Sequence, residues 1–257
     1  SVEDLIPDQD VVVTITRSGY SKRTKADLYR SQRRGGKGVK GAALKQDDLV
    51  DHFFVASTHD WLLFFTNKGR VYRAKVHELP DAGRDARGQH VANLLAFKPD
   101  ETIAQVIAIP NYEAFPYLVL ATRSGLTKKS PLSEYDSART GGLIAINLRE
   151  GDVVVSMDVV STAEKDTAQL VTISRSGKGK RTPVVLYRAK GRGTQGMATM
   201  GLVENDVIAT ACVINADMVL TFITSNGIVL KTQASDVRAC GRSAQGVRVL
   251  SLNENDS

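Results

Sequence analysis

The chain has 257 residues, of which 42% are hydrophobic and 24% charged, a balance that excludes a disordered, collagen-like or coiled-coil chain. Its 34 Lys and Arg outnumber its 28 Asp and Glu, and the resulting charge of +6 is compatible with a polyanionic partner if the excess is clustered. No apolar run approaches the roughly 18 residues of a membrane span, and residues 1–10 do not resemble a signal peptide. We therefore expect a cytoplasmic protein without a membrane partner.

The cysteines and histidines form no recognisable metal-binding pattern. Cys212 and Cys240 each lie in or beside an apolar stretch, where a buried free thiol is the usual case. The histidines are scattered and lack the spacing of a zinc site; they are His52, His59, His77 and His90. The sequence therefore predicts structural thiols and no metal centre.

An internal repeat with a period of about 50 residues runs along the chain. An apolar run followed by Thr or Ser, two residues and Gly occurs in every copy, with the glycines at Gly19, Gly69, Gly125, Gly177 and Gly227. Aspartates recur in step with these glycines, at Asp48, Asp100, Asp152, Asp206 and Asp256. We expect one domain of five blades, with limits near 1–48, 49–100, 101–152, 153–206 and 207–257.

Each copy is predicted to form four short strands, as in residues 49–56, 61–66, 70–75 and 91–97 of the second copy. The repeated glycine supplies the positive φ of a tight hairpin, and the repeated aspartate closes a turn through its side chain. Four-stranded sheets stacked radially bury both faces, so the predicted fold is all-β, a propeller-like pinwheel of five four-stranded blades. Strand exchange between copies and an open spiral are alternatives for its closure.

A basic position recurs four residues after each hairpin glycine. It is occupied by Arg23, Arg73, Lys129, Arg181 and Lys231, and three copies place a lysine directly before it: Lys22, Lys128 and Lys180. Around a propeller, these side chains would give each blade one or two cations on the same surface, which suits a polyanion. The alternative is that the strands alternate apolar residues with cations for solubility and edge protection.

The first copy carries the densest charge, because residues 17–45 contain ten cations and the single acid Asp27. A heptapeptide in this segment combines cations that can reach phosphates with glycines that leave backbone N–H groups accessible. Its residues are Gln32, Arg33, Arg34, Gly35, Gly36, Lys37 and Gly38. Such contacts would position nucleic acid without reading its sequence.

The heptapeptide resembles the GyrA-box, and the five copies resemble the β-pinwheel blades, of the C-terminal domain of the DNA gyrase A subunit. Degenerate counterparts of the box stand in residues 84–88, 137–142, 191–196 and 241–246. The related domain of topoisomerase IV, a DNA tether, usually has a degraded box, so the intact heptapeptide favours gyrase. The resemblance implies sequence-independent binding, bending and chiral wrapping of double-stranded DNA around a basic rim, which enables gyrase to introduce negative supercoils.

The resemblance also implies where the chemistry lies. In gyrase, DNA cleavage belongs to the N-terminal part of the A subunit, whereas ATP is hydrolysed by the B subunit. We therefore expect these two parts as partners in a bacterial, nucleoid-associated enzyme. ATP and Mg²⁺ are expected on those other parts, with no catalytic residue, cofactor, metal or small-molecule substrate in this chain.

Two further function classes are weighed against this expectation. The G-x-G-x-x-G matches at residues 36–41 and 191–196 lack the strand–helix context of a dinucleotide site, and no nucleophile, base and acid converge as in an enzyme. A propeller that binds an acidic protein through its basic rim is the other alternative. An exposed aromatic patch would mark it, yet aromatic residues make up only 6% of the chain and fall mostly in predicted strands.

Overall fold

The computed structural model describes residues 1–30, 48–214, 219–223, 226, 228–233 and 247–248. The chain divides into two compact units, one of residues 1–64, 71–111 and 138–143 and one of residues 65–70, 112–137 and 144–257. Strands dominate the described residues, which contain one four-residue helix, α1 (Asp27–Arg30). No helix in this described part is long and apolar enough to cross a membrane. The predicted all-β class is confirmed.

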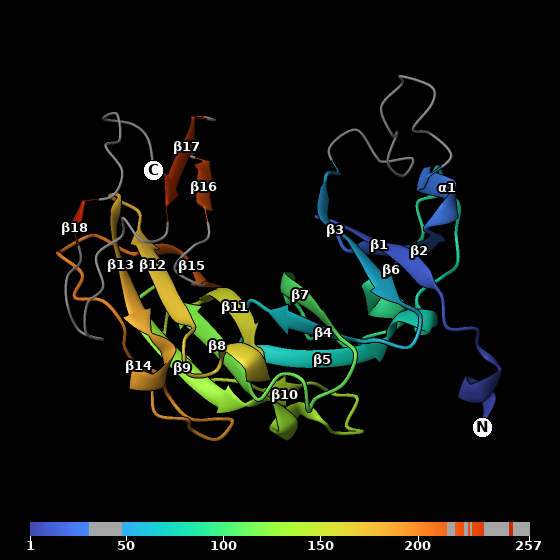
Figure 1. Ribbon diagram of the computed structural model, residues 1–257, viewed down its shortest axis with the longest axis horizontal. Coiled ribbons are helices and arrows are strands. Elements are labelled where there is room, and N and C mark those ends of the chain that lie inside the picture. Colours follow the sequence, from blue (N-terminus) through green and yellow to red (C-terminus); the bar gives the residue numbers. More distant parts are fainter. Residues whose placement is uncertain (31–47, 215–218, 224–225, 227, 234–246, 249–257) are drawn as a thin grey trace. The chain divides into compact units, whose positions relative to one another are not determined.

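The described residues form four antiparallel sheets of four strands and one separate hairpin (Figure 1). The first sheet has the order β3 (Val50–Ser57), β1 (Asp10–Thr16), β2 (Tyr20–Lys25), β6 (Gln89–His90), and the second has the order β10 (Leu143–Ile144), β5 (Arg70–Lys75), β4 (Trp61–Thr66), β7 (Ile103–Ile109). The third contains β11 (Val154–Val160), β8 (Tyr117–Thr122), β9 (Leu126–Pro131) and β14 (Met197–Ala198). The fourth contains β15 (Ile208–Ile214), β12 (Gln169–Ser174), β13 (Lys178–Pro183) and β18 (Val247–Arg248), and the hairpin is β16 (Val219–Ile223) with β17 (Val229–Gln233).

Short 3-10 turns lie between these strands. They are η1 (Val2–Leu5), η2 (Val76–Glu78), η3 (Val91–Asn93), η4 (Leu132–Tyr135), η5 (Thr162–Glu164) and η6 (Val184–Leu186). Three of them, η2, η4 and η6, directly follow the second strand of a hairpin, so the chain leaves the hairpins of the second, third and fourth copies by the same kind of turn.

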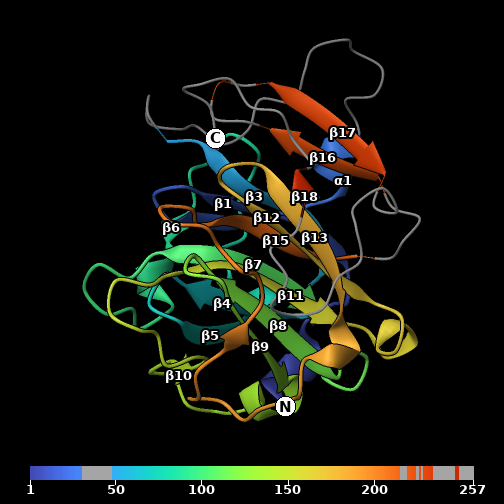
Figure 2. The same ribbon diagram turned by 90° about the vertical axis from the view of Figure 1, so that its left-hand side faces the viewer.

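Each four-stranded sheet combines strands from two successive copies (Figures 1 and 2). In the first sheet, the hairpin β1–β2 comes from the first copy, whereas β3 and β6 come from the second; the other three sheets repeat this division. Strand exchange, one of the two predicted alternatives, is therefore present. The limits 1–48, 49–100, 101–152, 153–206 and 207–257 delimit copies of the sequence rather than sheets. The fifth sheet is described only as a hairpin, so five four-stranded blades stay a prediction.

The turns of the first four hairpins each end on a glycine with positive φ, as predicted. These values are +98° at Gly19, +74° at Gly69, +97° at Gly125 and +91° at Gly177. At Gly19 a second constraint applies, because a Cβ there would lie 2.9 Å from Nε2 of His90. Gly227 lies outside the described residues.

In three copies, the repeated aspartate binds the hairpin turn of its own copy. Asp48 accepts hydrogen bonds from the backbone N–H and the hydroxyl of Ser18, at 3.0 and 2.6 Å. The same two bonds join Asp152 to Ser124, at 3.0 and 2.5 Å, and Asp206 to Ser176, at 3.1 and 2.6 Å. Each aspartate precedes a strand that enters the earlier copy's sheet, so these aspartate clamps, as we call the three pairs, anchor the exchanged strands. The predicted turn role is confirmed for them.

Apolar residues on the central strands form the core of each unit. In the first unit, Val11, Val13 and Ile15 alternate along β1 and pack in one cluster with Leu62 and Phe64 of β4. In the second unit, the corresponding cluster contains Val119, Ala121, Leu170, Val184 and Tyr187. The other face of β1 is also covered, because Thr14 and Thr16 are only 2% and 3% exposed. The hairpins are therefore buried on both faces.

Candidate nucleic-acid interface

The predicted main contact lies outside the described residues. It comprises Gln32, Arg33, Arg34, Gly35, Gly36, Lys37 and Gly38. The described chain stops before it at the helix α1 and resumes after it at Asp48, which is held in the first aspartate clamp. In the sequence, the heptapeptide lies between α1 and Asp48, and its role stays a prediction.

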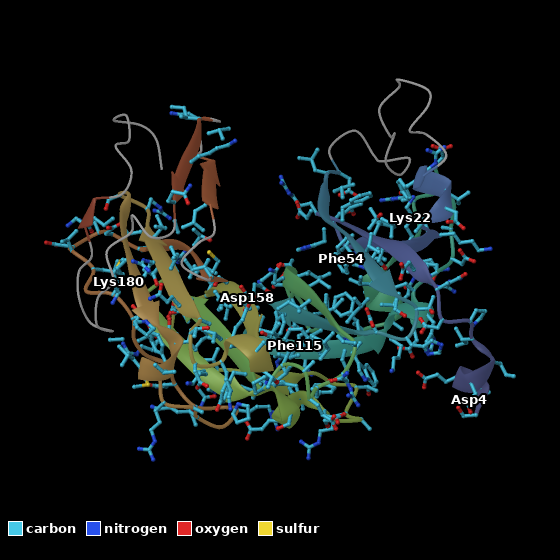
Figure 3. All side chains as sticks on the ribbon, in the orientation of Figure 1. Asp4, Lys22, Phe54, Phe115, Asp158 and Lys180 are labelled. Atoms are coloured by element: carbon cyan, nitrogen blue, oxygen red, sulfur yellow. The ribbon has the colours of Figure 1, made fainter. Side chains whose placement is uncertain are left out.

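The paired lysines, predicted as surface cations, lie inside the fold. Lys22, Lys128 and Lys180 are 1%, 2% and 0% exposed. Figure 3 labels Lys22 and Lys180 among the side chains. Lys22 Nζ donates to the carbonyl oxygens of Gly83 and Arg84, at 2.8 and 2.7 Å, and Lys128 Nζ donates to those of Ala145 and Thr194, at 2.7 and 3.3 Å. The expectation of a charged surface at these three positions is corrected, because all three side chains are buried and those of Lys22 and Lys128 point to loops that cover their strands.

Burial weakens the proton affinity of Lys22 and Lys128. It lowers the pKa of Lys22 below its ordinary range and that of Lys128 to about 8. Both ammonium groups satisfy backbone carbonyls that would otherwise be buried without a donor. These two lysines are therefore structural tethers.

The loops that these lysines bind are the counterparts of the heptapeptide in later copies. Lys22 binds the carbonyl of Arg84, the first residue of the segment 84–88, and Lys128 binds that of Thr194 within 191–196. In the second copy, the same strand position is Tyr72, whose ring is so close to Gly142 that a Cβ there would lie 2.7 Å from Cζ. Gly142 ends the counterpart 137–142. In three successive copies, the third residue after the hairpin glycine thus holds the loop equivalent to the box.

The second basic position is mostly engaged within the fold. Arg23 donates to the carbonyl of Leu79 at 2.9 Å, and the Arg73 guanidinium lies 3.9 Å from the ring centroid of Trp61. Lys129, 7% exposed, donates to the carbonyl of Val184 at 3.2 Å, and burial lowers its pKa. Arg181 donates to the side chain of Gln169 at 2.6 Å and is half-buried, whereas Lys231 is exposed. Among these five residues, Lys231 presents the most open cation and Lys129 the least.

A different set of repeated cations is exposed, at the hairpin turns. Arg17, Arg123 and Arg175 each precede the hairpin glycine by two residues, and their side chains lie on the surface. Their backbone N–H groups donate to the carbonyls of the residues directly before the exchanged strands, namely Leu49, Val153 and Val207, at 2.7, 2.9 and 2.8 Å. In the second copy, Lys68 is the exposed cation of the turn.

The sequence contained the signal for these turn cations, since Thr or Ser, Arg, Ser and Gly repeat in three copies. The same motif marks the hairpin turns, and that is the only role the sequence pattern indicated for it. Arg17 pairs with Asp51 at 3.4 Å, but both side chains are solvent-exposed, so the ion pair contributes little to stability. Another anion can therefore readily replace Asp51 as the partner of Arg17.

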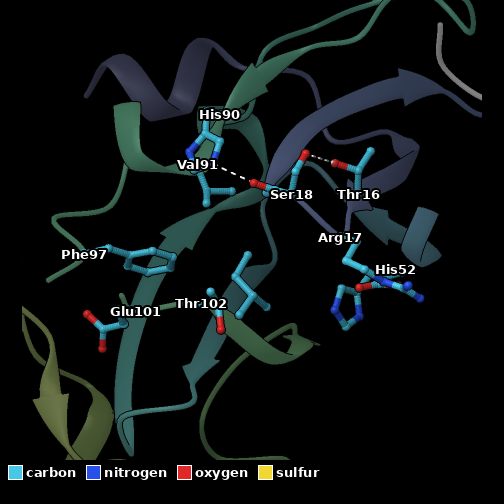
Figure 4. A pocket seen from close by; sticks show the side chains of 12 residues that line it. Thr16, Arg17, Ser18, His52, His90, Val91, Phe97, Glu101 and Thr102 are labelled. Carbon is cyan, nitrogen blue, oxygen red and sulfur yellow. Dashed lines mark hydrogen bonds and ion pairs between the residues drawn. The ribbon is translucent and has the colours of Figure 1, made fainter. Parts of the chain in front are cut away.

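A pocket lies beside the first hairpin turn and is drawn in Figure 4. It is lined by Arg17, Asp51, His52, His90 and Glu101, among others, and His90 Nε2 is 2.7 Å from the carbonyl oxygen of Ser18. Burial lowers the pKa of His52, which favours its neutral form. Because one arginine faces two carboxylates, the lining does not define an anion site.

Cys212 is a free thiol in the structure. Burial raises its pKa to about 11, so a thiolate nucleophile is disfavoured there. This agrees with the predicted structural role, and Cys240 lies outside the described residues.

Repeated hairpins, exchanged outer strands and turns that display a cation in the first four copies define a strand-exchanged, propeller-like repeat protein with a basic character. The chain belongs to the family described as the DNA gyrase C-terminal domain, beta-propeller, whose sequence model matches residues 10–57, 60–110, 116–161, 168–215 and 219–257. Each of the first four matched segments starts with a hairpin or the residues directly before it and extends into the first strand of the next copy, which is the unit that strand exchange creates.

Individual relatives agree with this family. The DNA gyrase A subunit of Streptomyces coelicolor is 48% identical over 312 residues, which cover 100% of this chain and 36% of that protein. The chain thus spans about a third of the length of the curated relatives that it matches. The solved DNA gyrase A C-terminal domain is similar with a TM-score of 0.63 and 22% identity, and the E. coli ParC C-terminal domain with 0.72 and 16%; both comparisons cover 97% of each chain. The resemblance and the fold class predicted from the sequence are confirmed.

Proposed function

We propose that this chain is the DNA-binding accessory domain of a DNA gyrase, which binds duplex DNA independently of sequence and wraps it so that strand passage introduces negative supercoils. Its relatives over the whole chain are named as the DNA gyrase A subunit. The structural observation that carries the proposal is the exposed arginine at the same place in three hairpin turns: Arg17, Arg123 and Arg175.

Wrapping requires cations that are spread along the DNA. Smoothly bending 20–30 base pairs by 40–90° costs on the order of 1–6 kcal/mol. The contacts that offset this cost must be spread along the bent DNA, and one isolated patch does not do this. Each cation that neutralises a phosphate releases counterions and adds about 0.9 to the slope of log K against log salt concentration. Turn cations in the first four copies, together with Lys231 in the fifth, meet both requirements.

The proposed contacts fall into two groups. The heptapeptide supplies the densest group through Arg33, Arg34 and Lys37, with glycines that allow close approach of the backbone. The turn cations and Lys231 extend the contact to other copies. Lys22 and Lys128 act indirectly, since each is buried and holds a box-equivalent loop, and Lys180 is buried as well.

The proposed partners are double-stranded DNA, the N-terminal part of the gyrase A subunit, and the gyrase B subunit. In this proposal, DNA cleavage and ATP hydrolysis with Mg²⁺ belong to those parts, and this chain supplies no catalytic group. The proposed location is the bacterial nucleoid.

The test is ligation of nicked plasmid in the presence of the chain, followed by removal of protein and separation of topoisomers. Wrapping predicts a dose-dependent, positive shift in linking number. The triple variant Arg33→Ala, Arg34→Ala, Lys37→Ala is expected to lose most of this shift while it still binds DNA, because the turn cations remain.

The alternatives give different results in the same assay. Tight binding without a shift in linking number would indicate a non-wrapping tether of the topoisomerase IV type. Absence of DNA binding at moderate salt would indicate a propeller that binds an acidic protein partner instead.

A further inference from the structure

Two histidines that are distant in sequence meet one carboxylate in the first unit. His59 lies in the turn between β3 and β4, His77 in η2 and Glu3 in η1. Oε1 of Glu3 is 3.5 Å from Nδ1 of His59 and 3.7 Å from Nε2 of His77. One ligand atom from each of the three residues lies within 4.8 Å of the other two.

The hydrogen bonding of His59 determines which of its nitrogens is free to bind. Its Nε2 lies 2.7 Å from the carbonyl oxygen of Ile6, which can only accept, so Nε2 carries the hydrogen. In the neutral ring, the lone pair of Nδ1 then faces the carboxylate of Glu3. Nε2 of His77 faces the same oxygen, is shielded from solvent and has no hydrogen-bond partner. When both facing nitrogens are deprotonated, a shared cation would relieve the repulsion between their lone pairs and the carboxylate.

The separations suit a tetrahedral metal ion. Zinc binds imidazole nitrogen and carboxylate oxygen at about 2.0–2.2 Å, which places neighbouring ligand atoms about 3.3–3.6 Å apart. The observed 3.5 and 3.7 Å are close to this range. A metal-binding histidine usually donates its other N–H to a carbonyl or carboxylate, and His59 already does so to Ile6.

The N-terminal segment is held in place by contacts other than Glu3. Thr58 Oγ1 donates to the carbonyl of Pro7 at 2.6 Å, and Ser57 Oγ donates to Asp8 at 2.5 Å. These bonds keep Glu3 near the two histidines before any ion binds, which reduces the entropy lost on binding.

One group competes with a metal for the carboxylate. Lys75 Nζ is 3.3 Å from Oε1 of Glu3. It also donates to the carbonyl of His59 at 3.0 Å and lies 4.4 Å from the ring centroid of Trp61. Because Lys75 keeps these two contacts if Glu3 turns toward an ion, its presence weakens metal binding without preventing it.

We propose that Glu3, His59 and His77 form a binding site for a divalent transition-metal ion, best matched by Zn²⁺, which fixes η1 to the turns at the end of the hairpin β4–β5. Nitrogen and oxygen ligands of this kind suit zinc among the common divalent metals. The sequence predicted no metal centre because the three ligands follow no zinc spacing; the folded chain brings them together. The proposal is independent of DNA binding.

The test is calorimetric titration of the 257-residue chain, freed of metal by a chelator, with zinc chloride. We expect saturable binding of one ion and a rise in melting temperature that the chelator reverses. Glu3→Gln, His59→Gln and His77→Gln should each weaken binding by more than the 10–100-fold that loss of an outer-shell partner typically costs. Lys75→Met should bind more tightly than the unmodified chain.

Matched controls separate this site from other zinc ligands. His52→Gln and His90→Gln remove the two histidines outside the cluster and should bind zinc like the unmodified chain. Glu3 is exposed at 44% of its side chain, so its replacement tests the site even if a histidine variant unfolds. The proposal is overturned if neither the unmodified chain nor Lys75→Met binds one ion, or if binding survives unchanged in Glu3→Gln and in a folded His59→Gln or His77→Gln variant.

Discussion

The ammonium group of Lys22 lies 2.7 Å from the carbonyl oxygen of Arg84, and this bond ties a strand of the first copy to the box-equivalent loop of the second. The pairing places a charge in the protein interior, where it satisfies two carbonyls and is almost completely shielded from solvent. A lysine in a strand of a basic repeat can thus stabilise the fold without binding a polyanion.

Replacing this lysine should destabilise the fold. In Lys22→Met, the carbonyls of Gly83 and Arg84 lose their donor, so we expect a loss of about 1–3 kcal/mol in the free energy of unfolding. Urea denaturation measures the change. Lys25→Met, at an exposed position of the same strand, is the control and should stay within about 0.5 kcal/mol. Equal stability of the two variants would contradict the tether.

Burial of Lys128 predicts a pH dependence with a definite sign. The pKa of its ammonium group falls from 10.5 to about 8 in the folded chain, so between these values the unfolded chain binds more protons. The stability of the unmodified chain relative to Lys128→Met should therefore rise with pH above about 8, by at most about 1.4 kcal/mol per pH unit. Denaturation of both proteins at intervals from pH 7 to 9.5 checks this. A difference that stays constant or falls would be evidence against a depressed pKa.

The aspartate clamp at Asp206 should make the fold sensitive to acid. Burial alone would raise the pKa of this carboxyl, but hydrogen bonds from Ser176 and its neighbours outweigh burial and lower it. The clamp therefore stabilises the fold at neutral pH and loses its effect as the pH falls through the lowered pKa. Asp206→Asn should cost about 1–2 kcal/mol at pH 7 and progressively less in acid.

A double-mutant cycle with Ser176→Ala measures the same clamp. Both changes remove one interaction, so their effects at pH 7 should be clearly less than additive. Additive losses would show that the two side chains do not stabilise the fold through each other.

Two adjacent glycines distinguish a tethered loop from an open one. Gly142 has φ +81°, and a Cβ there would lie 2.7 Å from Cζ of the buried Tyr72, whereas a Cβ on Gly141 would contact nothing within 4 Å. Gly142→Ala should therefore destabilise the fold by about 1–3 kcal/mol, and Gly141→Ala by no more than about 0.5 kcal/mol. Thermal denaturation of the two variants provides the comparison, and similar melting temperatures would show that the loop is not held against Tyr72.

The turn arginines should set the salt dependence of DNA binding. Arg175→Ala removes one proposed phosphate contact, so the slope of log K against log salt should decrease in magnitude by about 0.9. Lys165→Ala is the matched control, because this exposed cation follows η5, at the other end of β12 from the hairpin turn. Titrations of a duplex at several salt concentrations give both slopes. If Lys165→Ala changed the slope as much as Arg175→Ala, binding would depend on total charge rather than on the turns.

Local geometry made several features readable from the amino-acid sequence. A tight hairpin needs positive φ at one position, so Gly19, Gly125 and Gly177 marked the turns that the structure contains. An aspartate side chain readily accepts from a turn N–H, so the periodic aspartates predicted the role that Asp152 and Asp206 have. Both signals depend on a few residues around a turn, and the repeat multiplied them.

The tertiary structure decided what depends on segments far apart in the chain. The pairing of β3 with β1 joins strands of different copies, so the period alone assigned four strands to one copy and left strand exchange as one of two alternatives. Whether a strand cation faces solvent depends on the loop that covers it, which is why Lys22 is buried while Arg17 is exposed. The meeting of His59 and His77 likewise arises only when the strands between them fold back. The sequence by itself determined the repeat, its turns and its family, because those are encoded locally; burial and long-range pairing come from packing.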